Sequence, residues 1–175
     1  MHISKWVSLF LIGFFPSAIW RSEDNYEQIS ADLVPSVGVE IHSIKHGKKG
    51  KKSLVAREVG GLMMPMWPRF FGECDTFVFV VDMSQRAMIS EATMELYELL
   101  THDETQGKNI GLVLNKGDLP CTLSRKEIDW VMQLPKLQME VERLQVFELS
   151  ALTGQGTDLL LGWIIEKTQG SASIG

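Results

Sequence analysis

Three short apolar runs constrain the fold of this chain more than any other feature of its sequence. Thr76–Val81 reads TFVFVV, Ile110–Leu114 reads IGLVL, and Val146–Leu149 is a weaker third case. A β-rich run without polar–apolar alternation is typical of a strand that is buried on both faces, as in a parallel sheet. The sequence therefore predicts a mainly parallel sheet built around these segments.

Helical patterns lie between and after the apolar runs. Met88–Thr101 repeats its large apolar residues at helical spacing. Ser124 and Glu127 have the S-x-x-E form of a capping box, which opens a helix that we expect Pro135 to end. Leu159–Ile165 predicts a last helix. Strand and helix in alternation predict an α/β fold with helices on both faces of the sheet.

A hairpin is predicted before the first of these strands. Val37–Ile44 alternates as V-G-V-E-I-H-S-I, and Ser53–Val59 resumes extended character after a turn rich in glycine and lysine. The lysines at the tip could form a nuclear-import signal or an anionic-surface patch. We favour the simpler interpretation of a solvated tip, in which lysines discourage pairing between sheet edges.

The N-terminal part is unlike the rest of the chain. Trp6–Trp20 is a nearly unbroken apolar run, shorter than the ~20 residues of a membrane-spanning helix and containing Pro16. It has the basic start of a signal peptide but a poor cleavage site. A secretory signal, a membrane anchor and a buried strand centred on Leu9–Ile12 all remain open. Because His2 stands where myristoylation requires a glycine, we expect no myristoylation.

Length and composition suit one domain, which we place at residues 34–169 between an atypical leader (1–33) and a flexible tail (170–175). The 175-residue chain has a net charge of −5 and a pI of about 5.4, which argues against nucleic-acid binding. Its four histidines are scattered and show no metal-binding pattern. Cys74 and Cys121 do not form a C-x-x-C pair, and free thiols favour a cytoplasmic location.

Polar residues follow the predicted strands at the edge where ligands bind in such folds. Asn115–Asp118 has the form N-K-x-D directly after a buried strand. The carboxylate of Asp118 can accept two N–H donors from one edge of guanine, a pair that adenine lacks. The apolar stem of Lys116 can cover the base, and Asn115 can hold neighbouring loops by hydrogen bonds. The alternative is an Asx-type turn without a ligand.

The order of several motifs resembles that of the ADP-ribosylation factor-like small GTPases, over about Val34–Ile165. N-K-x-D is continued by Leu119-Pro120, and Ser150-Ala151 resembles the S-A element of that family. The earlier motifs are P-S-V-G at 35–38, R-E-V-G-G at 57–61, P-M-W at 65–67 with F-F at 70–71, and F-V-V-D at 79–82. The joint order is far more specific than any one motif.

That resemblance implies a P-loop-NTPase-like G domain that binds GTP or GDP with Mg²⁺. It implies guanine recognition by Asn115, Lys116 and Asp118, assisted by Ser150 and Ala151, whose backbone N–H would contact the guanine oxygen. It also implies a Mg²⁺ ligand at Ser36, a backbone contact from Gly61 to the γ-phosphate, and Glu58 in place of the switch aspartate. A protein effector would bind through the switch segments and the interswitch hairpin, in a role in intracellular traffic.

Two departures from the family pattern concern the phosphates. No G-x-x-x-x-G-K-[ST] pattern lies between Met1 and Ser36, and the lysine-rich segment 47–53 has the wrong glycine spacing. Leu62 stands where the family places the glutamine that orients the attacking water. We therefore expect weak GTP binding and slow or absent hydrolysis.

The alternatives are a nucleotide-free interaction module and a secreted or membrane-anchored protein. For the first, the apolar stripe Met63–Phe71 would be either core or a partner surface.

Overall fold

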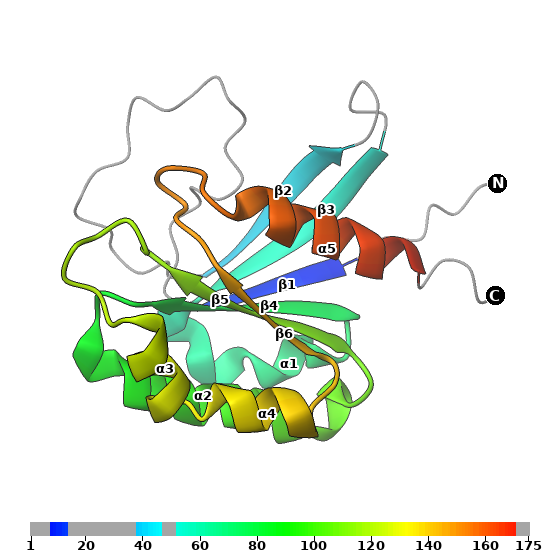
Figure 1. Ribbon diagram of the computed structural model, residues 1–175. Helices are drawn as coiled ribbons and strands as arrows, with labels where there is room; N and C mark the ends of the chain where they lie inside the picture. Colours follow the sequence, from blue (N-terminus) through cyan, green and yellow to red (C-terminus); the bar gives the residue numbers. More distant parts are fainter. Residues whose placement is uncertain (1–7, 14–37, 47–51, 171–175) are drawn as a thin grey trace, which may run out of the picture.

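A six-stranded sheet organises the residues described by the computed structural model, which are 8–13, 38–46 and 52–170 (Figure 1). The strand order is β2-β3-β1-β4-β5-β6, and among the described strands only the β2–β3 pair is antiparallel. The predicted parallel sheet with one antiparallel hairpin is therefore confirmed. The strands are β1 Ser8–Gly13, β2 Val39–His46, β3 Lys52–Gly60, β4 Thr76–Asp82, β5 Asn109–Asn115 and β6 Leu144–Glu148.

Helices cover both faces of the sheet, as expected. The α-helices are α1 Pro68–Phe71, α2 Ile89–Thr101, α3 Arg125–Val131, α4 Leu134–Glu140 and α5 Thr157–Gly170, and the 3-10 helices are η4 Gly61–Met66, η5 Arg86–Met88 and η6 Asp103–Thr105. In Figure 1, α1–α4 lie on one side and α5 on the other. Strand β4 serves both layers, because Phe77, Phe79 and Val81 pack with α1–α4 while Val78 and Val80 pack with α5.

The apolar N-terminal segment contributes a strand. β1 pairs in parallel with both β3 and β4, so it lies inside the sheet rather than at its edge. Its bounds, Ser8–Gly13, contain the expected strand centre Leu9–Ile12. A part of the segment 1–33 thus belongs to the same sheet as the rest of the chain. Among the described residues, no helix combines the length and apolar character needed to cross a membrane.

The prediction that Pro135 ends a helix is wrong. Helix α3 already ends at Val131, and Gln133 adopts a left-handed conformation with φ 54°. Pro135 then lies in the first turn of a separate helix, α4. Proline fits that turn because its missing N–H would have no intrahelical partner there. The sequence pattern thus missed the break at Met132 and Gln133 and assigned the proline to the wrong side of it.

The apolar stripe after Gly61 is mainly core. Trp67 and Phe71 are 5% and 2% exposed, and Met63, Met64 and Phe70 pack against the same core from partly buried positions. The Trp67 ring meets Phe79 edge-on at 6.2 Å between centroids, and Phe71 meets Phe77 in the same way at 5.6 Å. These aromatic pairs fix η4 and α1 against the sheet.

Candidate functional site

The carboxyl ends of the parallel strands bring the sequence-predicted residues to one edge of the sheet. Asp82 at the end of β4 lies opposite Asn115 at the end of β5. The chain leaving β6 stays beside β5, because the Leu149 N–H donates to the Leu114 carbonyl at 3.0 Å. The segments that carry N-K-x-D and S-A therefore meet, as expected.

Asn115 holds these loops together from a buried position. Its side chain is 3% exposed, and its Oδ1 accepts a hydrogen bond from the backbone N–H of Ala151 at 3.0 Å. Its backbone carbonyl accepts from the N–H of Met83 at 3.1 Å. A buried residue whose side chain and backbone each bond to another loop fixes the relative position of those loops, since losing either contact would leave a buried polar group unpaired.

Lys116 turns the chain at this edge. It adopts φ 68°, a left-handed conformation that costs a non-glycine residue ~1–2 kcal/mol. Its Nζ lies 2.7 Å from Oδ2 of Asp82, whose Oδ1 accepts hydrogen bonds from the backbone N–H and the hydroxyl of Ser84 at 2.9 and 2.6 Å. The ammonium group is therefore fixed over the end of β4, and its apolar stem runs along the same edge.

Asp118 carries a polar atom that the rest of the described structure does not satisfy. Its Oδ1 is shielded from solvent and has no hydrogen-bond partner among the described residues. A buried acceptor without a donor costs ~1–3 kcal/mol, so native proteins keep few such atoms. A ligand with N–H donors directed at this carboxylate would satisfy it, and guanine presents such donors. The residues present therefore fit the nucleotide that the sequence predicts.

The S-A element is ordered by its own hydrogen bonds. Ser150 is 1% exposed, its Oγ accepts from the Thr153 N–H at 3.1 Å, and its carbonyl accepts from Gly154 at 2.9 Å. The N–H of Ala151, expected to face a guanine oxygen, instead donates to Asn115. The structure thus gives this N–H a role in joining the loops.

The residues expected near the phosphates lie along the same edge of the sheet, on β3 and after it, and β1 separates them from β4. Gly60 at the end of β3 is in register with Gly13 of β1, which is in register with Val80 of β4. Gly61 is buried at the start of η4. Glu58 is 3% exposed, and its Oε2 lies 3.3 Å from Nε2 of His42 on β2. Ser36 and the side chain of Leu62 lie outside the described residues.

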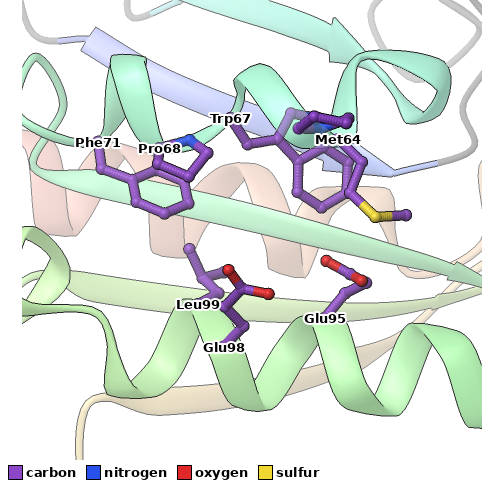
Figure 2. Close-up of a pocket in the computed structure, with 8 residues that line it drawn as sticks. Met64, Trp67, Pro68, Phe71, Glu95, Glu98 and Leu99 are labelled. Carbon is purple, nitrogen blue, oxygen red and sulfur yellow. The ribbon is translucent and has the colours of Figure 1, made fainter.

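A cavity of about 160 Å³ lies between the η4–α1 segment and α2, on the face of the sheet that α1–α4 cover. Figure 2 shows the carboxylates of Glu95 and Glu98 on α2 facing Met64 and Trp67 across it. Burial raises the pKa of Glu95, and the nearby charges of Glu98 and Glu91 raise it further. The cavity is lined by Met64, Pro65, Trp67, Pro68, Phe71, Glu95, Glu98 and Leu99.

Sequence reasoning did not single out these acidic residues. Glu91, Glu95 and Glu98 are spaced at i, i+4 and i+7, which places them on one face of α2. That spacing was the available signal, although only the packing of η4 shows that the face borders a cavity.

Comparison with known proteins places this geometry in a family. The sequence matches the ADP-ribosylation factor family over residues 23–168. It is 30% identical over 131 residues to human ADP-ribosylation factor-like protein 16, covering 74% of this chain and 64% of that protein. It is 27% identical over 138 residues to ADP-ribosylation factor-like protein 1 of Caenorhabditis elegans, covering 78% and 74%. The chain thus spans less than two thirds of the human relative's length.

The fold is also that of a solved structure, the Arl6 (BBS3) small GTPase from Trypanosoma brucei with the bound nucleotide analogue GppNp. The TM-score is 0.71 at 18% sequence identity, over 93% of this chain and 97% of that one. The family match covers most of the chain, the sheet has the expected topology, and the N-K-x-D and S-A segments meet at its edge. This chain belongs to the ADP-ribosylation factor family of small GTPases.

Proposed function

We propose that this chain binds a guanine nucleotide, GTP or GDP, at the carboxyl edge of the sheet and acts as a partner-binding switch with slow or absent hydrolysis. The observation that carries the proposal is the solvent-shielded Oδ1 of Asp118, which has no hydrogen-bond partner among the described residues. Guanine offers two adjacent N–H donors to a carboxylate, whereas the same edge of adenine offers no such pair. Asp118 would therefore select guanine.

The neighbouring residues would support that contact. Asn115 already joins the two loops through Ala151, so little ordering free energy is lost when a base binds. The ion pair between Lys116 and Asp82 holds the lysine stem along the strand ends, where it can cover one face of a base.

The phosphate side supports weaker binding than the base side. The sequence between Gly13 and Ser36 contains no G-x-x-x-x-G-K-[ST] pattern, which would surround the phosphates with backbone N–H groups. By family resemblance Ser36 and Glu58 would face a bound Mg²⁺, which supplies charge neutralisation at the phosphates. Because Oε2 of Glu58 instead lies 3.3 Å from Nε2 of His42, the support for Mg²⁺ rests mainly on the resemblance at Ser36. Leu62 can neither donate nor accept a hydrogen bond, so it cannot orient an attacking water.

A titration with fluorescent mant-GTP and mant-ATP in the presence of Mg²⁺ tests the nucleotide proposal. We expect saturable mant-GTP binding, a clear preference over mant-ATP, and at least a tenfold loss of affinity in Asp118→Ala, equivalent to about 1.4 kcal/mol. Asp103→Ala, an exposed aspartate in η6, is the matched control and should bind like wild type. Equal affinity for the two nucleotides, or an unaffected Asp118→Ala variant, would refute the proposal.

A hydrogen bond supports the switch part of the proposal. The indole Nε1–H of Trp67 donates to the Gly60 carbonyl at 3.3 Å, and Trp67 also lines the cavity beside α2. A nucleotide-dependent movement of Gly60 and Gly61 would therefore reach the cavity, where an effector could bind. We expect tryptophan emission to differ between the GTP-bound and GDP-bound states, and Trp67→Phe to remove that difference.

The matched control for Trp67→Phe is Trp130→Phe, because Trp130 is 76% exposed on α3, away from the cavity. The control should retain the emission difference. If Trp67→Phe retains it as well, Trp67 does not report the nucleotide state.

The second candidate is a nucleotide-free interaction module that uses the same cavity, favoured by the missing phosphate-binding pattern. A saturable, sub-millimolar affinity for GTP would exclude it. We also propose a cytoplasmic location, since Cys74 and Cys121 are both free thiols, as is usual in reducing compartments. Cell fractionation would test that location directly.

A further inference from the structure

Three possible metal ligands converge on the β2–β3 hairpin. Glu40 and His42 are two residues apart on β2, so their side chains share one face of the strand. Glu58 lies directly opposite Glu40 on β3. One ligand atom of each residue lies within 4.8 Å of the other two. The sequence alone did not reveal this group, because the partner of Glu40 depends on the register of the hairpin.

The imidazole nitrogen Nε2 of His42 lies close to two carboxylates. This nitrogen is shielded from solvent, and no atom of the described residues lies in hydrogen-bonding geometry to it. It nevertheless lies 3.3 Å from Oε2 of Glu58 and 3.6 Å from Oε2 of Glu40. The neighbouring cation, Arg57, alternates to the other face of β3 and pairs with Glu73.

We propose that Glu40, His42 and Glu58 form a binding site for a divalent transition metal of the zinc class. Zinc binds imidazole nitrogen and carboxylate oxygen at ~2.0–2.2 Å in tetrahedral geometry, which sets neighbouring ligand atoms about 3.3–3.6 Å apart. The distances from Nε2 of His42 to the two carboxylate oxygens, 3.3 and 3.6 Å, match that spacing. A nitrogen ligand favours zinc, nickel, cobalt or copper over magnesium and calcium, which prefer oxygen.

The site would be open on one side. The Glu40 side chain is 58% exposed, whereas that of Glu58 is 4% exposed, so an ion can enter from the Glu40 side. Three protein ligands leave a fourth tetrahedral position for water or another small ligand. Among the described strands β2 lies at the edge and pairs with β3 alone, so the ion would fasten this edge strand to the sheet. The proposal does not depend on nucleotide binding.

Titration of the full chain with Co²⁺, followed by its visible absorption, tests the site. We expect one Co²⁺ per chain with the intense bands of tetrahedral coordination, and displacement by Zn²⁺. His42→Ala and Glu40→Gln should each lower the Co²⁺ affinity at least tenfold. Zn²⁺ should raise the Tm of the wild-type chain but not of these variants, because an ion that binds only the folded state stabilises it.

Three matched variants distinguish this site from other causes. His46→Ala removes a histidine at the end of the same strand, and Cys121→Ser removes the exposed thiol; both should bind Co²⁺ like wild type. Asp118→Ala should also leave Co²⁺ binding unchanged, which separates the metal site from the nucleotide edge.

Weak octahedral Co²⁺ bands, or identical titrations of wild type and Glu40→Gln, would overturn the proposal. Glu40→Gln is decisive even if His42→Ala folds poorly, since Glu40 is exposed and its replacement has nearly the same shape.

Discussion

Replacing Asn115 with alanine removes one buried side-chain oxygen that joins two loops. The lost contact is the 3.0 Å hydrogen bond from the Ala151 N–H to Oδ1. An N–H left without a partner costs ~1–3 kcal/mol when it is buried. Ala151 is only half-buried, so water can reach it in part, and we expect the lower half of that range, about 1–2 kcal/mol. The free energy of unfolding should fall by that amount.

Urea denaturation of the nucleotide-free protein is the assay. The midpoint should fall while the m-value stays constant, because the surface exposed on unfolding does not change. The control is Asn109→Ala, the same substitution at the other end of β5, where the half-buried side chain makes no hydrogen bond to another described residue. That variant should lose well under 1 kcal/mol.

The same substitution should weaken mant-GTP binding severalfold, since the loops would then have to be ordered when the nucleotide binds. Equal midpoints for Asn115→Ala and Asn109→Ala would show that the Asn115 contact contributes nothing to the fold. Unchanged mant-GTP affinity beside a lowered midpoint would show that the loops do not need this contact for binding.

Three further predictions concern the rest of the fold. Gly156→Ala should destabilise the protein by roughly 2 kcal/mol or more in urea denaturation, because Gly156 has φ 77° and a Cβ would lie 2.4 Å from a backbone carbonyl oxygen. Gly162→Ala should instead stabilise the protein by about 0.5–1 kcal/mol, because a Cβ at this position of α5 would meet open space. Hydrogen bonds from the backbone N–H and hydroxyl of the serine that caps α3 lower the pKa of Glu127 to about 2. The unfolded chain, with its ordinary glutamate value of 4.5, therefore takes up the proton first. In acid-denaturation curves, wild type should be more stable than Glu127→Gln, and this difference should be complete above pH 4.5. The difference should disappear as the pH falls towards 2. Burial raises the pKa of the Cys74 thiol to about 11, so a thiol-reactive dye should label exposed Cys121 rapidly and Cys74 only after denaturation; rapid labelling of both would contradict this.

Much of the fold could be predicted because the buried strands leave an unambiguous pattern. β4 and β5 have buried residues at almost every position, and no polar alternation obscures them. α2 begins within one residue of its predicted start and ends where predicted. Prediction failed at α4, where a proline permits either the end or the start of a helix, and packing against the sheet decides which. The short helix α1 has too few residues for a periodic signal.

In the candidate site, too, some residues could be predicted from the sequence and others depend on the fold. Asn115, Lys116 and Asp118 are consecutive or nearly so, and a motif that short can be recognised before the fold is known. The cavity beside α2 and the Glu40–His42–Glu58 group depend instead on how separate segments pack or pair. Four scattered histidines gave no reason to expect a metal site, although Glu40 and His42 at i and i+2 of a strand were a partial signal.

The central place of β1 has a consequence for any shortened form of this protein. Ser8–Gly13 fills the gap between β3 and β4, and both neighbours donate and accept hydrogen bonds along it. If a signal peptidase or another protease cleaved the chain after residue 13, β3 and β4 would each lose their hydrogen-bonding partner β1. Both would then have an unpaired strand edge. Such edges recruit other strands, so we expect that product to aggregate or to misassemble. We therefore expect the sheet to require Ser8–Gly13.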